Sequence, residues 1–117
     1  MELLEVATRE DRGWTVVVAA GQLDVATAPG FRQVLVESQY GGANDLLVDL
    51  CAVEFLDSFG LGVLVGALKR ARTHDARLVL VCCRPRTRQL FALTGLDAVF
   101  EVVDDQESVL AAAQPTD

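Results

Sequence analysis

The fold of this chain is decided by one stretch of fourteen residues, Val53-Glu54-Phe55-Leu56-Asp57-Ser58-Phe59-Gly60-Leu61-Gly62-Val63-Leu64-Val65-Gly66. An apolar strand over residues 46–51 ends just before it, and a helical pattern begins within it. Apolar side chains recur at positions 61, 64, 65 and 68, which is the spacing of one helix face. The stretch therefore predicts a strand, a loop and a helix in succession.

Two polar residues stand directly before the apolar face of that helix. Asp57 and Ser58 are both residue types that cap a helix by accepting hydrogen bonds from its free N–H groups. A hydroxyl at this place lies where a helix is electropositive and rich in backbone donors, so a phosphate on it would be well accommodated. Ser58 is therefore the first candidate functional residue.

The glycines that follow Ser58 also need an explanation. Gly60, Gly62 and Gly66 fall inside the predicted helix, where each glycine costs about 1 kcal/mol relative to alanine. For Gly66, close packing of the helix on the sheet and approach by a partner explain the residue equally well. For Gly60 and Gly62, beside the capping hydroxyl, the pattern favours a surface that a partner approaches.

Composition and charge limit the class of protein. The chain has 117 residues, of which 51% are hydrophobic and 23% charged, and its formal net charge is −7. These values predict one domain over residues 1–117, with a core from about residue 3 to residue 113. The acidic balance argues against nucleic acid or an anionic membrane as the main partner. No apolar run could cross a bilayer and no signal peptide is visible, so a cytoplasmic protein is expected.

Strand and helix patterns alternate on both sides of the central stretch. Before it we expect strands over 3–9 and 14–20, a loop over Gly21-Gln22-Leu23-Asp24, and a helix from the N-cap Thr27 through Pro29 to about Tyr40, stopped by Gly41-Gly42. The buried side of this helix is predicted to consist of Ala28, Phe31, Val34, Leu35 and Ser38.

After the central stretch, the first helix is expected to run to about Arg72. A strand over 77–83, a helix over 85–94 ended by Gly95, a strand over 99–103 and a helix to Ala113, capped by Asp104 and Glu107, should follow. This order predicts an α/β fold: a small mixed β-sheet with an antiparallel N-terminal edge and then βα units, with about four helices and at least one face covered.

The cysteines and the single histidine suggest no chemistry. Cys51, Cys82 and Cys83 lie in apolar strand patterns and are expected to be buried free thiols in a reducing cytoplasm. They do not supply the four spaced ligands that zinc needs. A triad of Ser58, His74 and Asp75 fails because about 24 Å of helix would separate the serine from the histidine.

A nucleotide site is the other chemical interpretation of the glycines. Gly60-Leu61-Gly62 lies between a strand and a helix, but the spacing is not G-x-G-x-x-G and no P-loop lysine is present. We therefore expect no enzymatic activity, no catalytic residue, no metal and no cofactor.

Three segments resemble one protein family. Leu56-Asp57-Ser58-Phe59-Gly60-Leu61-Gly62-Val63-Leu64 resembles the D-S-[ST]-G-L-G motif of bacterial anti-sigma factor antagonists, the small STAS-domain proteins. Gly21-Gln22-Leu23-Asp24, with Thr27 after it, resembles their G-E-L-D…T segment, and Leu90-Phe91-Ala92-Leu93-Thr94-Gly95-Leu96 resembles their L-F-x-x-[ST]-G-L segment. The segments keep the family's order and spacing, so the resemblance covers nearly the whole chain and implies a STAS-like fold.

The resemblance implies a partner-switching protein that regulates transcription. In the family, the unphosphorylated antagonist binds an anti-sigma factor that is also a GHKL-type serine kinase, and a sigma factor is released. The kinase then phosphorylates the serine matching Ser58, and a PP2C-type phosphatase reverses this step. The residues matching Asp24, Thr27, Asp57 and Gly60 would form the surroundings of the phosphorylated serine.

Two residues depart from the family pattern. Phe59 replaces the usual second hydroxyl and adds a bulky ring to the partner face, and Gln22 replaces the usual glutamate and removes a negative charge. Phe59, Gly62 and Val63 lie off the core stripe of the central helix, so we expect them to form the docking surface.

Two other functions remain open. One is a STAS scaffold subunit of a larger assembly, such as a stressosome or a lipid-transport complex, in which Ser58 would only be an N-cap. The other is binding of a small ligand or nucleotide by the same glycines.

Overall fold

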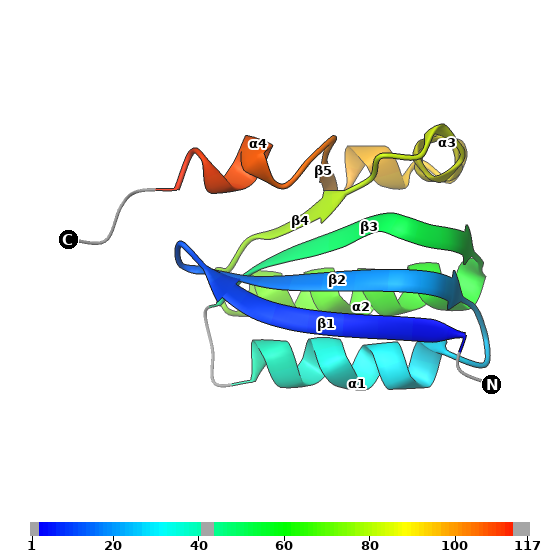
Figure 1. The fold of residues 1–117 in the computed structure, drawn as a ribbon, viewed down its shortest axis with the longest axis horizontal. Coiled ribbons are helices and arrows are strands. Elements are labelled where there is room, and N and C mark those ends of the chain that lie inside the picture. The colour runs from blue at the N-terminus through cyan, green and yellow to red at the C-terminus, as the bar shows by residue number, and fades with distance from the viewer. Residues whose placement is uncertain (1–2, 41–43, 114–117) are drawn as a thin grey trace.

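The computed structural model describes residues 3–40 and 44–113. In chain order its elements are β1 (Leu4–Asp11), β2 (Trp14–Leu23), α1 (Ala28–Gln39), β3 (Asp45–Leu56), α2 (Ser58–Thr73), β4 (Leu78–Val81), α3 (Pro85–Leu93), the 3-10 helix η1 (Leu96–Ala98), β5 (Glu101–Val103) and α4 (Glu107–Leu110) (Figure 1). The five strands form one sheet in the order β1-β2-β3-β4-β5. β1 pairs with β2 antiparallel and the other neighbours are parallel, which confirms the predicted mixed α/β fold.

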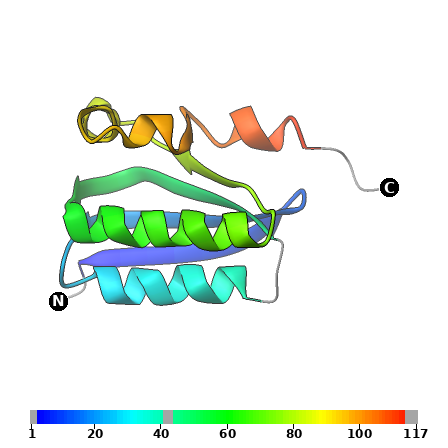
Figure 2. The same cartoon turned by 180° about the vertical axis from the view of Figure 1, so that it is seen from behind.

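The sheet carries a hydrophobic core on each face. Successive strand residues point to opposite faces, so Val17 and Leu46 join the larger core while Val16 and Leu47 join the smaller one. The larger core contains the buried sides of α1 and α2, which lie side by side over one face (Figure 2). The smaller core includes Val109 and Leu110 of α4. Helices therefore cover both faces of the sheet.

β2 and β3 continue beyond their predicted ends. The expected loop over residues 21–24 is wrong for its first three residues, because Gln22 pairs with Phe55 and Leu23 with Leu56 at the end of the parallel ladder. Gly21 permits this extension: its φ is +119°, and a Cβ there would collide with the carbonyl oxygen of Leu3. The pairing register between β2 and β3 shifts between Gly21 and Gln22, as at a β-bulge.

The predicted capping of α4 is also wrong. Asp104 forms an ion pair with Arg88, and Glu107 forms one with Arg12 at 2.8 Å. Asp105 instead accepts hydrogen bonds from the backbone N–H and the hydroxyl of Ser108, at 2.8 and 2.9 Å. The helix ends at Leu110 rather than Ala113. Both predicted capping residues form ion pairs with arginines from distant parts of the chain. The local sequence pattern does not indicate these pairs.

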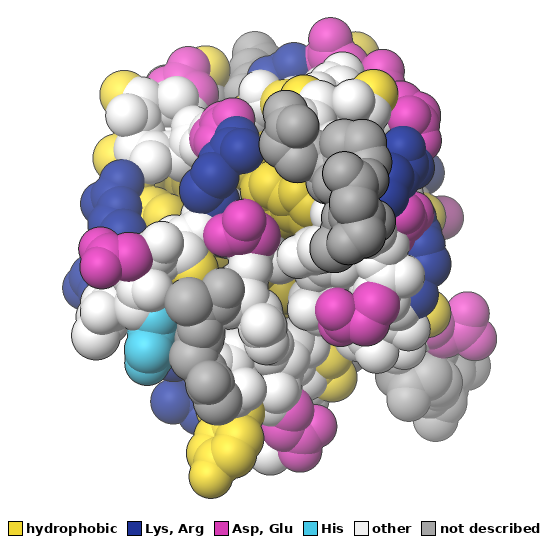
Figure 3. All heavy atoms as spheres, turned by 90° about the vertical axis from the view of Figure 1, so that its left-hand side faces the viewer, with side chains coloured by type: hydrophobic (Ala, Val, Ile, Leu, Met, Phe, Trp, Pro, Cys, Tyr) yellow, Lys and Arg dark blue, Asp and Glu magenta, His cyan; other side chains and the backbone are white. Residues whose placement is uncertain are grey.

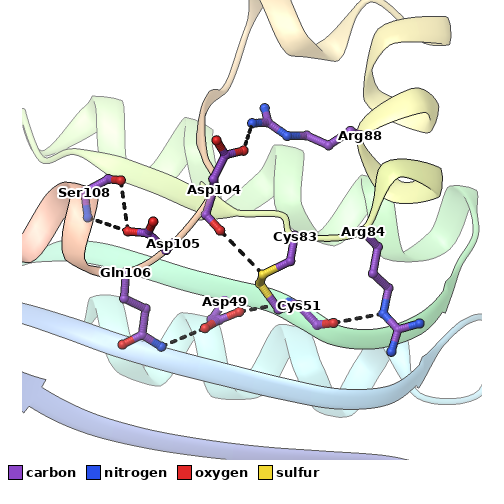
Figure 4. Close-up of a disulfide and its surroundings, with 9 residues drawn as sticks. All are labelled: Asp49, Cys51, Cys83, Arg84, Arg88, Asp104, Asp105, Gln106 and Ser108. Atoms are coloured by element: carbon purple, nitrogen blue, oxygen red, sulfur yellow. Dashed lines mark hydrogen bonds and ion pairs between the residues drawn. A yellow bond between two sulfur atoms is a disulfide. The ribbon is translucent and has the colours of Figure 1, made fainter.

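The expectation of three buried free thiols is wrong for two of the cysteines. Cys51 and Cys83 form a disulfide, with their Cα atoms 4.9 Å apart (Figure 4). The last residues that β3 and β4 pair with each other are Asp49 and Val81. Each cysteine lies two residues further along its own strand direction, so the two cysteines face each other. Cys82 is free and buried, and burial raises its pKa to about 11, so this thiol stays protonated near neutral pH.

The remaining predicted helices and strands are present in the structure. α1 begins after Thr27 with Pro29 in its first turn, and it buries Ala28, Phe31 and Leu35. Val34 and Ser38 are only partly buried, whereas Gln39 is buried. The predicted stop at Gly41-Gly42 lies outside the described residues. No helix within residues 3–40 and 44–113 is long and apolar enough to span a membrane.

Candidate docking and phosphorylation site

The carboxyl end of the sheet brings two acidic loops together. β2 and β3 end with Leu23 paired to Leu56, and the next residues along the two strands are Asp24 and Asp57. The backbone N–H of Asp57 donates to the carbonyl of Leu23 at 3.2 Å, which closes one loop on the other. α1 and α2 start from these loops. The segments that match the G-E-L-D and D-S-[ST]-G-L-G patterns thus meet at one edge of the molecule.

Asp57 caps α2, and Ser58 is the first residue of the helix. Asp57 Oδ1 accepts hydrogen bonds from the backbone N–H groups of Phe59 and Gly60, at 2.9 and 3.1 Å. The prediction that either residue could cap is therefore right for Asp57 and wrong for Ser58. Ser58 is exposed, and its hydroxyl makes no hydrogen bond with any residue that the structure describes. Because the aspartate satisfies the helix donors, the serine hydroxyl is left available.

Asp24 and Thr27 hold the neighbouring loop in shape. Asp24 Oδ1 accepts hydrogen bonds from the backbone N–H groups of Ala26 and Thr27, at 3.0 and 3.2 Å. The Thr27 hydroxyl donates to the carbonyl of Gln22 at 2.8 Å and accepts from the backbone N–H of Asp24 at 3.0 Å. Thr27 precedes α1 as predicted, but its side chain makes no capping bond to the helix. Its hydroxyl orders the loop instead.

The two glycines nearest Ser58 have different roles. Gly60 is buried, and a Cβ there would lie 2.6 Å from Leu56 Cδ1 and 2.7 Å from Leu23 Cγ. The expectation that Gly60 belongs to an approach surface is therefore wrong: its bare backbone lets α2 pack on the strand ends. Gly62 is exposed, and a Cβ on it would meet nothing within 4 Å, so its backbone stays open to a partner.

A groove runs along α2 on the side that faces α1. Its volume is about 510 Å³, and it is lined by Val25, Ala28, Pro29, Arg32, Ser58, Phe59, Gly62, Val63, Gly66 and Arg70. Phe59 is 56% exposed, whereas Leu61, Leu64 and Leu68 on the opposite side of the helix are buried in the core. The three residues predicted to form a docking surface, Phe59, Gly62 and Val63, therefore lie together beside Ser58.

The groove also contains residues that the sequence did not reveal. Val25, Pro29 and Arg32 come from α1 or the loop before it, and Arg70 comes from the last turns of α2. No local pattern signals them, because they reach the groove only through the packing of α1 beside α2.

The single histidine of the chain lies at the C-terminal end of α2. His74 caps the helix C-terminus and is exposed, sixteen residues after Ser58, so the two cannot act together. Acidic and basic side chains are interspersed over this end of the molecule (Figure 3). Within the described part of the chain, no group of three His, Cys, Asp or Glu residues could hold a metal ion.

Comparison with protein families identifies the domain. Residues 5–109 match the model of the STAS domain, which is most of the chain. The chain belongs to the STAS family. STAS proteins of this kind are regulatory binding proteins and not enzymes.

Known STAS proteins similar to this chain are anti-sigma factor antagonists. The anti-sigma-B factor antagonist of Staphylococcus aureus (strain NCTC 8325 / PS 47) is 36% identical over 107 residues, covering 92% of this chain and 98% of that protein. A solved anti-sigma factor antagonist from Mycobacterium paratuberculosis superposes with a TM-score of 0.86 at 30% identity, covering 94% of this STAS chain and 93% of the other. The Bacillus cell fate determinant SpoIIAA in its phosphorylated form has a TM-score of 0.69 at 20% identity, with 90% and 96% covered, and shares the fold.

Proposed function

We propose that this STAS protein is an anti-sigma factor antagonist controlled by phosphorylation of Ser58. The unphosphorylated protein binds an anti-sigma factor that is also a GHKL-type serine kinase, and a sigma factor is released. The kinase phosphorylates Ser58 with ATP and ends the binding, and a PP2C-type phosphatase restores it. The proposal rests above all on the exposed hydroxyl of Ser58, which forms no hydrogen bond with a described residue and lies at the end of an open groove.

Other hydroxyls in the segments that resemble the family are less available than Ser58. The Thr27 hydroxyl is part-buried and bonded to the carbonyl of Gln22. The Thr94 hydroxyl donates to the carbonyls of Leu90 and Phe91, at 2.9 and 3.2 Å. A kinase would have to break these bonds before either threonine could attack a phosphate. The names of the relatives support antagonism of an anti-sigma factor, and SpoIIAA, which shares the fold, has been solved in a phosphorylated form.

Phosphate incorporation tests the assignment of Ser58. Incubation with a GHKL-type anti-sigma kinase and ATP should add one phosphate to the wild-type protein, as measured by intact mass. Ser58→Ala should add none and should still bind the kinase. Thr8→Ala is the matched control, because Thr8 is also an exposed hydroxyl with no hydrogen bond to a described residue; it should be phosphorylated like the wild type. Incorporation in Ser58→Ala that maps to Thr27 or Thr94 would refute the assignment.

The same experiment separates the switch from a scaffold role. Stable binding to the kinase with no phosphate on Ser58, under conditions that phosphorylate a known antagonist, would favour the scaffold.

The proposed function requires a cytoplasmic protein, because sigma factors and ATP are found there. Cytoplasmic reductants keep most thiols reduced, so we expect the Cys51–Cys83 pair to be cleaved in the cell and partner binding to persist.

A further inference from the structure

Arg70 has an unusual position at the far end of the groove. Its Nε donates to Oε1 of Gln39 at 2.9 Å. Its Nη2 is buried and has no hydrogen-bond partner among the described residues. Its Nη1 lies beside Gly66, 3.5 Å from where a Cβ would be. A guanidinium normally has acceptors for its donors when it is removed from water, so this side chain is left incompletely satisfied.

The surrounding contacts hold Arg70 in this place. Gln39 is buried, and its Nε2 donates to the carbonyl of Ala67 at 2.8 Å. The amide thus bridges the end of α1 to α2 and fixes its own oxygen toward Arg70 Nε. Gly66 contributes no side chain, and a Cβ there would be in ordinary van der Waals contact with Arg70 Nη1. The guanidinium is therefore positioned by the fold and lines the groove.

A second arginine stands near the first. Arg32 on α1 lines the same groove, is exposed and forms no hydrogen bond or ion pair with the residues that the structure describes. Burial, and then the positive charge of Arg32, lowers the pKa of Arg70. The described residues that line the groove include two arginines and no aspartate or glutamate, in a chain of net charge −7. Two like charges are kept together here without a counter-charge.

We propose that Arg32 and Arg70 form a carboxylate-binding subsite for an aspartate or glutamate side chain of the anti-sigma factor. This inference rests on the proposed function, since it supposes that the anti-sigma factor docks along the groove. A carboxylate matches the forked donors of a guanidinium, and it would accept from Arg32 and from Nη1 of Arg70, which forms no hydrogen bond with a described residue and is not among the buried unpaired atoms. Its negative charge would also relieve the repulsion between the two arginines.

Arg70, one of the two arginines of the subsite, lies far from the phosphorylation switch. Arg70 lies twelve residues after Ser58 on one helix, which is about 18 Å at 1.5 Å per residue. A phosphate on Ser58 therefore cannot reach the Arg70 guanidinium within the same chain. Ser58 would decide whether the partner binds, while the arginines would decide which partner binds and in which register along α2.

Binding measurements on glutamine variants test the subsite. The affinity of the unphosphorylated protein for the GHKL-type anti-sigma factor would be measured at low and high salt for Arg32→Gln, Arg70→Gln and the double variant. We expect the double variant to lose ten- to hundredfold in affinity and much of the salt dependence. Arg86→Gln is the matched control, because Arg86 is exposed, lies outside this groove and forms no hydrogen bond or ion pair with a described residue. It should bind like the wild type.

A charge exchange makes the test independent of folding. Arg32 is exposed and makes no ion pair with a described residue, so Arg32→Glu should fold normally even if Arg70 variants do not. It should weaken binding, and an Asp→Arg or Glu→Arg change at one position of the anti-sigma factor should restore it. Wild-type affinity in both Arg32→Glu and Arg70→Gln, while phosphorylation of Ser58 still abolishes binding, would overturn the subsite and leave the proposed function intact. Failure of the wild-type protein to bind would overturn both.

Discussion

At the residue scale, α2 contains two glycines two positions apart with opposite surroundings. A Cβ on Gly60 would meet Leu56, Leu23 and a backbone oxygen at 2.6–3.1 Å, whereas a Cβ on Gly62 would meet nothing within 4 Å. The first glycine is needed for packing of the helix on the strand ends. The second leaves the groove open.

This contrast gives a matched pair of variants. Gly60→Ala should lower the free energy of unfolding by about 1–3 kcal/mol, because the methyl group overpacks a site closed by backbone and core atoms. Gly62→Ala should leave it unchanged or raise it by up to about 1 kcal/mol, because alanine favours the helix. Urea denaturation of both variants measures the difference. Equal stabilities would show that the close contact at Gly60 relaxes without cost.

Phe59 is a large apolar residue of α2 that lies outside the hydrophobic core. It is 56% exposed and lines the groove next to Ser58. Phe59→Ala should weaken binding to the anti-sigma factor by about 1–4 kcal/mol, roughly five- to a thousandfold in Kd, as for an aromatic hot spot. Its melting temperature should change little. Tyr40→Ala is a suitable control, because Tyr40 is 85% exposed and does not line this groove; an equal loss of affinity there would argue against a specific role for Phe59.

At the element scale, the disulfide joins two segments that the sheet no longer pairs. Cys51 lies in β3 and Cys83 follows β4, 32 residues later, and the bond holds the start of α3 against β3 (Figure 4). Arg84 adds a hydrogen bond from its Nε to the carbonyl of Cys51 at 2.9 Å. At the start of α4, Gln106 Nε2 donates to Asp49 Oδ2 at 2.7 Å, so α4 is also attached to β3.

Reduction of the disulfide should therefore lower the free energy of unfolding without weakening partner binding. A cross-link of this span stabilises a domain by about 2–4 kcal/mol, so the oxidised protein should unfold at higher urea than the protein treated with a dithiol. The Cys51→Ser/Cys83→Ser variant should show no response to the reductant. Affinity for the anti-sigma factor should be the same in both states, because neither cysteine lines the groove. A large loss of affinity on reduction would mean that α3 takes part in docking.

At the scale of the whole molecule, phosphorylation should act locally. A phosphate on Ser58 adds about −1.5 to −2 charges at pH 7. At the N-terminus of α2 this charge is favourable by about 0.3–1 kcal/mol, so the fold should tolerate it. In a complex the same phosphate must lose water close to Asp57 and fit between apposed surfaces. The cost falls on the bound state, where 1.4 kcal/mol already changes affinity about tenfold.

The expected result is a loss of affinity with an unchanged fold. Phosphorylated and unphosphorylated protein should give the same far-UV spectrum and nearly the same melting temperature, while affinity for the kinase falls at least tenfold. Ser58→Asp should reproduce only part of the loss, because one carboxylate carries less charge and fewer acceptor oxygens. A global change in the spectrum, or unchanged affinity at full phosphorylation, would contradict the local mechanism.

The sequence by itself determined the order of elements, the mixed sheet and the position of Ser58. These follow from local causes: apolar periodicity, the helix-forming pattern after Asp57, and residues such as Pro29 and Gly95 that begin or end a helix. The family resemblance added the expectation that Asp24 and Asp57 both lie near Ser58. The parallel pairing of β2 with β3 agrees with that expectation.

The tertiary structure alone decided which side chains meet. The strand ends beyond residues 20 and 51 form because β2 and β3 pair there, which no local propensity encodes. Gly60 proved to be a packing residue because Leu23, from a distant strand, lies against it. The disulfide between Cys51 and Cys83, and the groove that Arg32 and Arg70 both line, likewise bring together residues more than thirty positions apart in the chain. Such contacts depend on how the elements pack, so a pattern read along the chain could not predict them.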